Sequence, residues 1–134
     1  PYSLFYISLL SCFALVLAYL IVRLRYKTRI GLGDGDNERL TRQIRVQANF
    51  LENFLPFALL FLLTEIHNPG MLLLPIIGCI FFIARLFHAY GLSLSSGRSF
   101  GRYYGTLATW LSLLLLIVVN LYHSILLLIY ALEG

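Results

Sequence analysis

Charged residues are scarce in this sequence of 134 residues. They make up 12% of it, whereas hydrophobic residues make up 60%. A soluble globular domain carries roughly 25% charged residues. The composition therefore excludes an ordinary soluble domain and indicates a membrane protein, and the length suits a single domain.

Cysteine is also scarce, with only Cys12 and Cys79, each inside an apolar run. The two are too far apart for a metal-binding or redox spacing, so we expect both to be buried as small hydrophobic residues. No basic region precedes the first apolar stretch, which ends in arginines and not in a small-residue cleavage site. We therefore expect a membrane anchor and not a cleaved signal peptide.

The glycine-rich stretch at residues 31–37 is missing the features of two common binding loops. A phosphate loop needs a preceding strand and a following lysine with a hydroxyl residue. A calcium loop needs more oxygen ligands and a terminal glutamate. Three glycines at alternate positions predict instead a turn, with Asp36 or Asn37 capping the next helix.

Four apolar stretches are long enough to cross a bilayer as helices. They span about residues 2–25, 37–66, 70–91 and 102–131. We predict an all-α fold, an integral membrane four-helix bundle that forms one domain over residues 1–134. Small residues recur at helical spacing at Gly101, Gly105, Ala108 and Ser112, which predicts close helix packing. Asn120 and His123 lie deep in the last stretch, and we expect them to form hydrogen bonds between helices.

Basic residues are concentrated in two of the three connections. Seven of the ten lie between Arg23 and Arg45, and Arg98 and Arg102 lie in or beside the third connection. Their place beside apolar stretches is typical of a topology signal and of lipid headgroup contacts, not of a nucleic-acid surface. The positive-inside rule puts the first and third loops in the cytoplasm and both termini on the opposite side. The short chain and this loop pattern favour a bacterial inner membrane.

Arg45, Asn49 and Glu52 form a polar face at the start of the second apolar stretch. Their spacing of i, i+4 and i+7 places them on one side of a helix. Arg85 lies inside the third stretch, where an arginine needs a partner. We expect Glu52 to pair with it, and His88 shares its face. Two interpretations stay open: a binding surface for a small charged molecule, or an internal polar network between helices.

The residue types in this cluster suit a ligand with several charged groups. Arginines pair bidentately with carboxylates, a glutamate accepts from an ammonium, and an asparagine pairs with an amide. Arg98, near the mouth, would lower the pKa of a thiol by stabilising its thiolate. Glutathione carries all of these groups, although an acidic peptide or a nucleotide fragment would satisfy many of the same residues.

The same residues resemble the MAPEG family, the membrane-associated proteins of eicosanoid and glutathione metabolism. The resemblance covers nearly the whole chain. It rests on the four apolar stretches and on three motifs: Gly31-Leu32-Gly33-Asp34-Gly35 in the basic first loop, Arg45-x-x-x-Asn49-x-x-Glu52 leading into Phe54-Leu55-Pro56, and Ala84-Arg85-Leu86-Phe87-His88. It implies a homotrimer that binds glutathione between neighbouring subunits near the cytoplasmic face.

The resemblance also implies roles for single residues. The matching glutathione-binding positions are Arg23 or Arg25, Arg45, Asn49, Glu52, Arg85 and His88. Arg98 falls closest to the arginine that activates the thiol, with Arg102 as its rival and a further candidate for glutathione binding. Two positions depart from the family pattern: Leu92 stands where several members have a tyrosine, and Asn53 where some have an aromatic residue.

Our main hypothesis is a glutathione-dependent membrane transferase or peroxidase. In it, an arginine-stabilised glutathione thiolate attacks a lipophilic electrophile or a hydroperoxide that arrives through the lipid. Glutathione, the electrophile, membrane lipid and neighbouring subunits are then the partners, with no metal and no nucleic acid. The alternative is a non-catalytic membrane protein whose polar cluster fixes trimer packing or binds a lipid headgroup. A transporter is a weaker option, because the polar residues do not continue through the bilayer.

Overall fold

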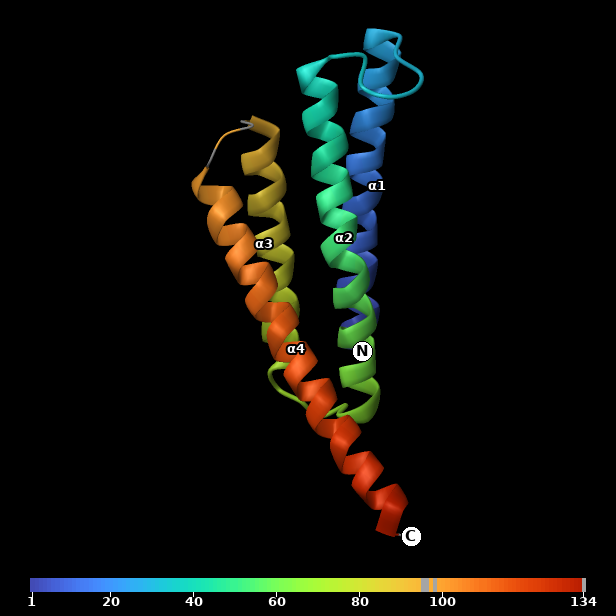
Figure 1. The fold of residues 1–134 in the computed structure, drawn as a ribbon, viewed down its shortest axis with the longest axis vertical. Coiled ribbons are helices and arrows are strands. Elements are labelled where there is room, and N and C mark those ends of the chain that lie inside the picture. Colours follow the sequence, from blue (N-terminus) through green and yellow to red (C-terminus); the bar gives the residue numbers. More distant parts are fainter. Residues whose placement is uncertain (95–96, 98, 134) are drawn as a thin grey trace.

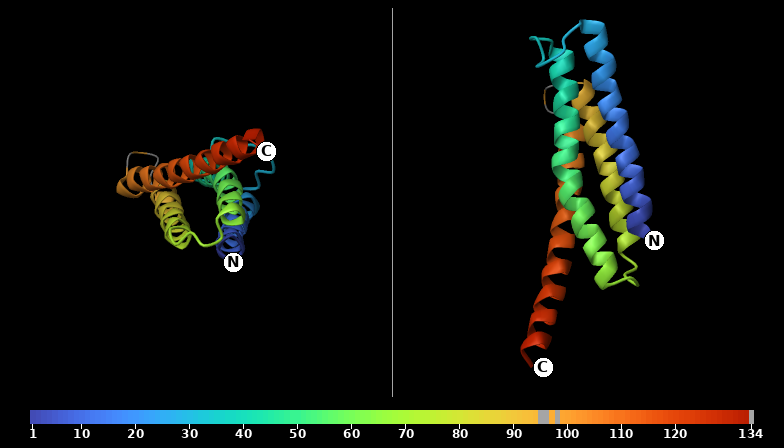
Figure 2. Two further views of the ribbon diagram at one scale, coloured as in Figure 1. Left: turned by 90° about the horizontal axis from the view of Figure 1, so that it is seen from below. Right: turned by 90° about the vertical axis from the view of Figure 1, so that its right-hand side faces the viewer.

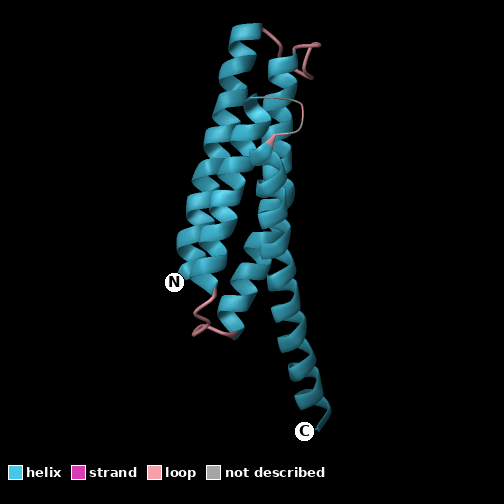
Figure 3. Cartoon of the chain, turned by 90° about the vertical axis from the view of Figure 1, so that its left-hand side faces the viewer, coloured by secondary structure: helices cyan, strands magenta, loops and turns pink. Residues whose placement is uncertain are grey.

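The computed structural model describes residues 1–94, 97 and 99–133, and all regular secondary structure in these ranges is helical (Figure 3). The helices are α1 (Tyr2–Thr28), α2 (Glu38–His67), α3 (Leu74–Leu94) and α4 (Phe100–Glu133). Each is long and apolar enough to cross a membrane. The predicted all-α class and the four membrane-length helices are confirmed.

The helices pack as two antiparallel pairs, α1 with α2 and α3 with α4 (Figures 1 and 2). The α2 helix also contacts both members of the other pair, and α1 contacts α3. With 34 residues, α4 is about 51 Å long at 1.5 Å per residue. It crosses the bundle at an angle and its last turns project beyond the other helices (Figure 1). Much of its apolar surface is exposed in the single chain.

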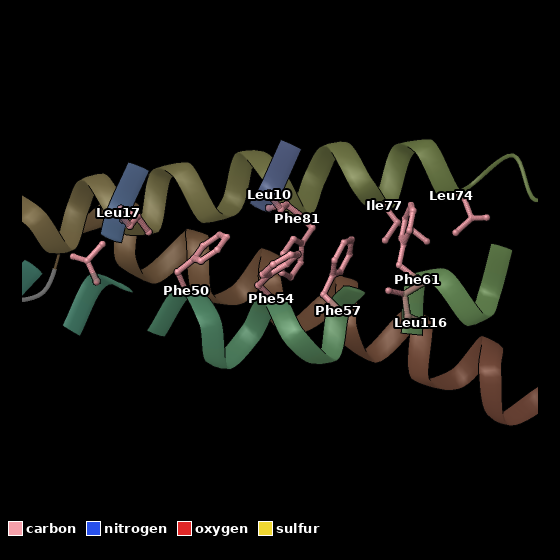
Figure 4. Close-up of a cluster of buried hydrophobic side chains, with 12 residues drawn as sticks. Leu10, Leu17, Phe50, Phe54, Phe57, Phe61, Leu74, Ile77, Phe81 and Leu116 are labelled. Atoms are coloured by element: carbon pink, nitrogen blue, oxygen red, sulfur yellow. The ribbon is translucent and has the colours of Figure 1, made fainter. Parts of the chain in front are cut away.

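A row of phenylalanines from α2 forms the centre of the bundle (Figure 4). Phe50, Phe54, Phe57 and Phe61 recur at i, i+4, i+7 and i+11, so they share one face of the helix. Phe57 stacks on Phe81 of α3 with ring centroids 3.6 Å apart. This buried face fixes the rotation of α2 about its own axis. Asn49, the residue before Phe50, is thereby turned toward α3.

Close contact between α3 and α4 depends on glycines. A Cβ atom added at Gly105 would lie 2.7 Å from the backbone oxygen of Ala84, and one added at Gly101 would lie 2.8 Å from that of Phe87. The predicted packing of this small-residue stripe is therefore confirmed. The expectation for the cysteines is wrong, because Cys12 and Cys79 are both exposed on the outside of the chain.

One group of polar contacts between helices lies at the end of the bundle away from the first loop. Asn120 donates from Nδ2 to the backbone oxygen of Leu60 (3.2 Å) and to Oγ1 of Thr64 (2.7 Å), so its predicted role is confirmed. His123 instead packs edge-on against Tyr122. The carboxylate of Glu65 accepts from the backbone N–H groups of Tyr2 and Ser3 at 2.7 and 2.8 Å, which caps the start of α1.

The helix ends follow from local chemistry. Asn37 caps α2, because its Oδ1 accepts from the backbone N–H of Leu40 at 3.0 Å. The α3 helix begins at Leu74 and not near residue 70, because residues 68–73 form turns. Pro75 then occupies the first turn of α3, where its missing N–H is no loss.

Candidate functional site

A cleft of about 530 Å³ opens at the end of the bundle that carries the first loop. The volume is within the range of small-molecule sites. Its walls come from the first loop, the start of α2, the end of α3 and the start of α4. The lining residues are Asp34, Asp36, Glu38, Thr41, Arg42, Arg45, Asn49, His88, Leu92 and Arg102. The cleft therefore combines arginines, carboxylates, an amide and an imidazole.

The acidic side of the cleft is built by the folding of the first loop. Arg25 donates to the backbone oxygens of Ile30 (3.2 Å) and Gly33 (2.9 Å), which holds the loop against the end of α1. Asp34 accepts from the Thr41 hydroxyl at 2.8 Å, which ties the loop to α2. This hydrogen bond, with one from the backbone N–H of Asp36, lowers the pKa of Asp34. The carboxylate is thus held ionised beside the arginines.

Arg85 lies one layer behind the cleft wall and is only 1% exposed. Its Nη2 donates to Oδ1 of Asn49 at 2.8 Å and lies 3.3 Å from Nδ1 of His88. Its Nη1 donates to the Thr109 hydroxyl at 3.4 Å. A guanidinium can only donate, so Nδ1 of His88 is the acceptor and the proton of the neutral ring is on Nε2. Arg85 therefore orients two residues that line the cleft, Asn49 and His88.

The positive charge of Arg85 has no carboxylate partner among the described residues. The side-chain ion pair formed there is Arg42 with Glu38, four residues apart on α2, and the carboxylate of Glu65 is at the other end of the bundle. The expected ion pair between Arg85 and Glu52 is not formed, and Glu52 is exposed on the outside of α2. Nε of Arg85 is buried and has no hydrogen-bond acceptor in the described part of the chain. Within the part of the chain that the structure describes, the site therefore has a buried cation without a counter-charge.

The other predicted residues are divided between three places. Arg45, Asn49, His88 and Arg102 meet in the cleft. Arg25 is used by the first loop, and Arg23 lines a separate small pocket between α1 and α2. Arg98, the expected thiolate-stabilising residue, lies outside the described residues.

Arg102 lies where the cleft meets a second, larger cavity of about 1060 Å³. Its Nη1 donates to the backbone oxygen of Gly97 at 2.7 Å. His88 lines both cavities too. The larger cavity is bounded by Tyr103, Leu107 and Trp110 from α4, and these side chains are exposed on the outside of the chain. A polar cleft and an aromatic cavity thus share one boundary, formed by His88 and Arg102.

Arg42 and the acidic residues of the cleft were not among the predicted site residues. Arg42 precedes Arg45 by three residues and Asn49 by seven, so extending the helical spacing one step would have found it. Asp34 and Asp36 carry no such periodic signal, because the contacts of the folded loop place them. Leu92 does line the cleft, so an apolar side chain stands there where the family resemblance leads to a tyrosine.

Comparisons with known proteins agree with this architecture. The sequence profile of the MAPEG family matches residues 3–122. Inner membrane protein YecN of Escherichia coli strain K12 is 35% identical over 104 residues, which cover 77% of each chain. The protein of the same name from strain O6:H1 of that species has the same identity and coverage.

Proposed function

This chain belongs to the MAPEG family, and from that premise we propose that it is a glutathione-dependent membrane transferase or peroxidase. Glutathione occupies the cleft lined by Arg45, Asn49 and His88. Its thiolate attacks a lipophilic electrophile or a hydroperoxide in the adjoining aromatic cavity. Whatever its activity, the chain is an integral membrane protein of this family.

The observation that carries the proposal is the uncompensated charge of Arg85. Burying an ion without a partner costs several kcal/mol, and in a membrane segment it marks a functional site by default. Two of its hydrogen-bond partners, Asn49 and His88, form part of the cleft wall. An anionic ligand in the cleft would bring negative charge within one layer of the guanidinium. Glutathione supplies two carboxylates and, after ionisation, a thiolate.

The charge pattern of the cleft suits a ligand that carries both signs. Arg42 and Arg45 offer donors in the forked geometry that carboxylates accept. Asp34 and Asp36 line the same cleft and suit the ammonium group. Asn49 keeps its amide nitrogen for a peptide oxygen, because its Oδ1 already accepts from Arg85.

The chemical step takes place at the boundary between the two cavities. An arginine of the third connection, Arg98 or Arg102, stabilises the thiolate. In conjugation, the thiolate sulfur forms a bond to an electrophilic carbon, and the leaving group departs with its electron pair. With a hydroperoxide, the sulfur bonds the terminal oxygen while the O–O bond breaks, and the alkoxide takes a proton. A second glutathione then reduces the sulfenic acid to give glutathione disulfide and water.

The exposed position of Glu52 supports the proposed homotrimer. A carboxylate on the outside of a membrane-spanning helix is unfavourable in contact with lipid, and a neighbouring subunit would cover it. We propose that glutathione in the cleft lies at the boundary between two subunits, where Glu52 completes the site. The proposed setting is the bacterial inner membrane, with the first and third loops in the cytoplasm and the termini on the other side.

The test is glutathione binding and conjugation by the purified protein, with Arg98→Ala and Arg102→Ala measured separately. Ultraviolet absorbance of bound thiolate near neutral pH reports the first step without an electrophile. We expect the wild type to show this absorbance and one of the two variants to lose it while still binding glutathione. A wild-type protein that binds no glutathione would end the proposal.

One observation favours the non-catalytic alternative. Arg85 joins three helices, through Asn49 on α2 and Thr109 on α4, so the network also stabilises the bundle. In that case Thr109→Val, which removes one acceptor of Arg85, would lower the unfolding temperature without ligand, and glutathione would not raise the unfolding temperature of the wild type.

A further inference from the structure

A second, smaller pocket lies between α1 and α2, outside the glutathione cleft. It has a volume of about 140 Å³ and is lined by Leu20, Arg23, Leu24, Lys27, Arg39 and Gln43. Residues 20, 23, 24 and 27 share one face of α1, and residues 39 and 43 share one face of α2. The last turns of α1 and the first turns of α2 lie side by side at the top of Figure 1. The pocket is therefore at the loop end of the membrane-spanning pair.

Among the described residues, three cations and no carboxylate line the pocket. Arg23, Lys27 and Arg39 line it together, and like charges that share one small pocket repel one another. The acids of the first loop do not relieve this repulsion, because Asp34 and Asp36 line the cleft on another side of α2. The local charge balance therefore calls for an anion.

Hydrogen bonding points to the same conclusion. Gln43 lines the pocket, and its buried Nε2 has no acceptor within the described ranges of the chain. The guanidinium groups of Arg23 and Arg39 and the ammonium group of Lys27 are donors without acceptor capacity. A ligand for this pocket must supply several acceptor oxygens and a negative charge, which are the properties of a phosphate group.

We propose that this pocket binds the phosphate of an anionic membrane phospholipid. Leu20 and Leu24 also line the pocket. Leu20 lies about one helical turn closer to the middle of α1 than Arg23, so the lining runs from apolar to cationic along the helix. A phospholipid has the same order of groups, with acyl chains attached next to its phosphate. A free phosphate ion would leave the two leucines unused. The proposal gives Arg23 a role that is separate from glutathione binding.

The probes are a short-chain phosphatidylglycerol, inorganic phosphate and glutathione, each titrated into the delipidated full-length protein in detergent. Lys27→Gln and Arg39→Gln each remove one cation from the pocket, and two variants guard against a folding defect in either one. Arg29→Gln is the matched control, because Arg29 is an exposed cation at the same end of α1 but lines no part of the pocket. Each basic residue near a membrane surface contributes enough for about a fivefold change in affinity.

We expect Lys27→Gln and Arg39→Gln each to weaken phosphatidylglycerol binding about fivefold, with glutathione binding and the control unchanged. Three results would overturn the proposal. An equal loss in Arg29→Gln would show that only diffuse surface charge matters. Inorganic phosphate that binds as tightly as the lipid would make a free anion the ligand. A parallel loss of glutathione affinity would assign the pocket to the glutathione site.

Discussion

Replacing Asn49 with leucine or with aspartate tests separately the hydrogen bonding and the charge of the buried Arg85. Asn49→Leu removes the acceptor that lies 2.8 Å from Nη2 and leaves a charged donor unsatisfied. Hydrogen bonds to charged groups contribute about 1.5–3 kcal/mol, so the free energy of unfolding should fall by about that amount. Leucine keeps a similar volume, so little of this loss would come from a cavity.

Asn49→Asp places a carboxylate at the same position. Two unit charges 4 Å apart attract by about 4 kcal/mol at an effective dielectric constant of 20. Burying the carboxylate offsets several kcal/mol of that gain, and Asn49 is only half-buried, which limits the offset. We therefore expect the free energy of unfolding of Asn49→Asp to be equal to or above that of the wild type. Glutathione binding should fall at least tenfold, because the new charge repels its carboxylates.

The assay is denaturant unfolding in detergent, followed by near-ultraviolet circular dichroism, together with glutathione titration of the same samples. A loss of stability in Asn49→Leu without a loss in Asn49→Asp, with weaker glutathione binding in both variants, would support an Arg85 that lacks a counter-charge. If Asn49→Asp destabilises the protein as much as Asn49→Leu, then the charge is already balanced and the argument for an anionic ligand fails.

Three further changes test the cleft and the packing around it. Leu92→Tyr places a phenol in the cleft, and one new hydrogen bond of about 1 kcal/mol should tighten glutathione binding about fivefold by calorimetry, whereas unchanged affinity would show that the position does not reach the ligand. Gly105→Ala places a Cβ atom 2.7 Å from a backbone oxygen of α3 and should lower the free energy of unfolding by about 1–3 kcal/mol. Gly70→Ala is the control, because Gly70 has open space around it and its replacement should leave the free energy of unfolding unchanged. Thr41→Val removes the main cause of the lowered pKa of Asp34, so NMR titration should give a higher pKa for Asp34 in the variant. Because the pKa is lowered in the folded loop, the ionised carboxylate stabilises the fold above the ordinary carboxyl pKa, and this stabilisation is lost as the pH falls through the lowered pKa. In Thr41→Val the two pKa values lie closer together, so the stability should depend on pH over a smaller range.

The apolar stretches were enough to predict the helices, because bilayer thickness fixes how long a spanning helix must be. Helical spacing also placed Arg45 and Asn49 together, and the structure puts both in the cleft. It did not place Arg85 correctly with respect to Glu52. Spacing along one helix says which residues share a face, but the partner depends on how far the facing helix is shifted along its axis.

The first loop shows a second limit of the sequence. Asn37 was identifiable as a helix cap because its chemistry acts on the next few residues. The approach of Asp34 and Asp36 to the arginines depends on Arg25 binding Gly33 and on Thr41 binding Asp34. Those contacts depend on the folded loop, and the glycine-rich composition predicts only that a turn exists.

The residues around Arg85 can form a stabilising network and also be part of a ligand site. Arg85 joins α2, α3 and α4 through Asn49, His88 and Thr109, and a complete network would leave nothing for a ligand to do. This network is incomplete, because it has donors and a positive charge but no anion among the described residues. A packing role alone would be served better by an apolar side chain, which often equals or exceeds a buried charge in stability. A buried charge that no anion balances therefore argues for an anionic ligand, and the two Asn49 variants measure whether the place for that ligand is open.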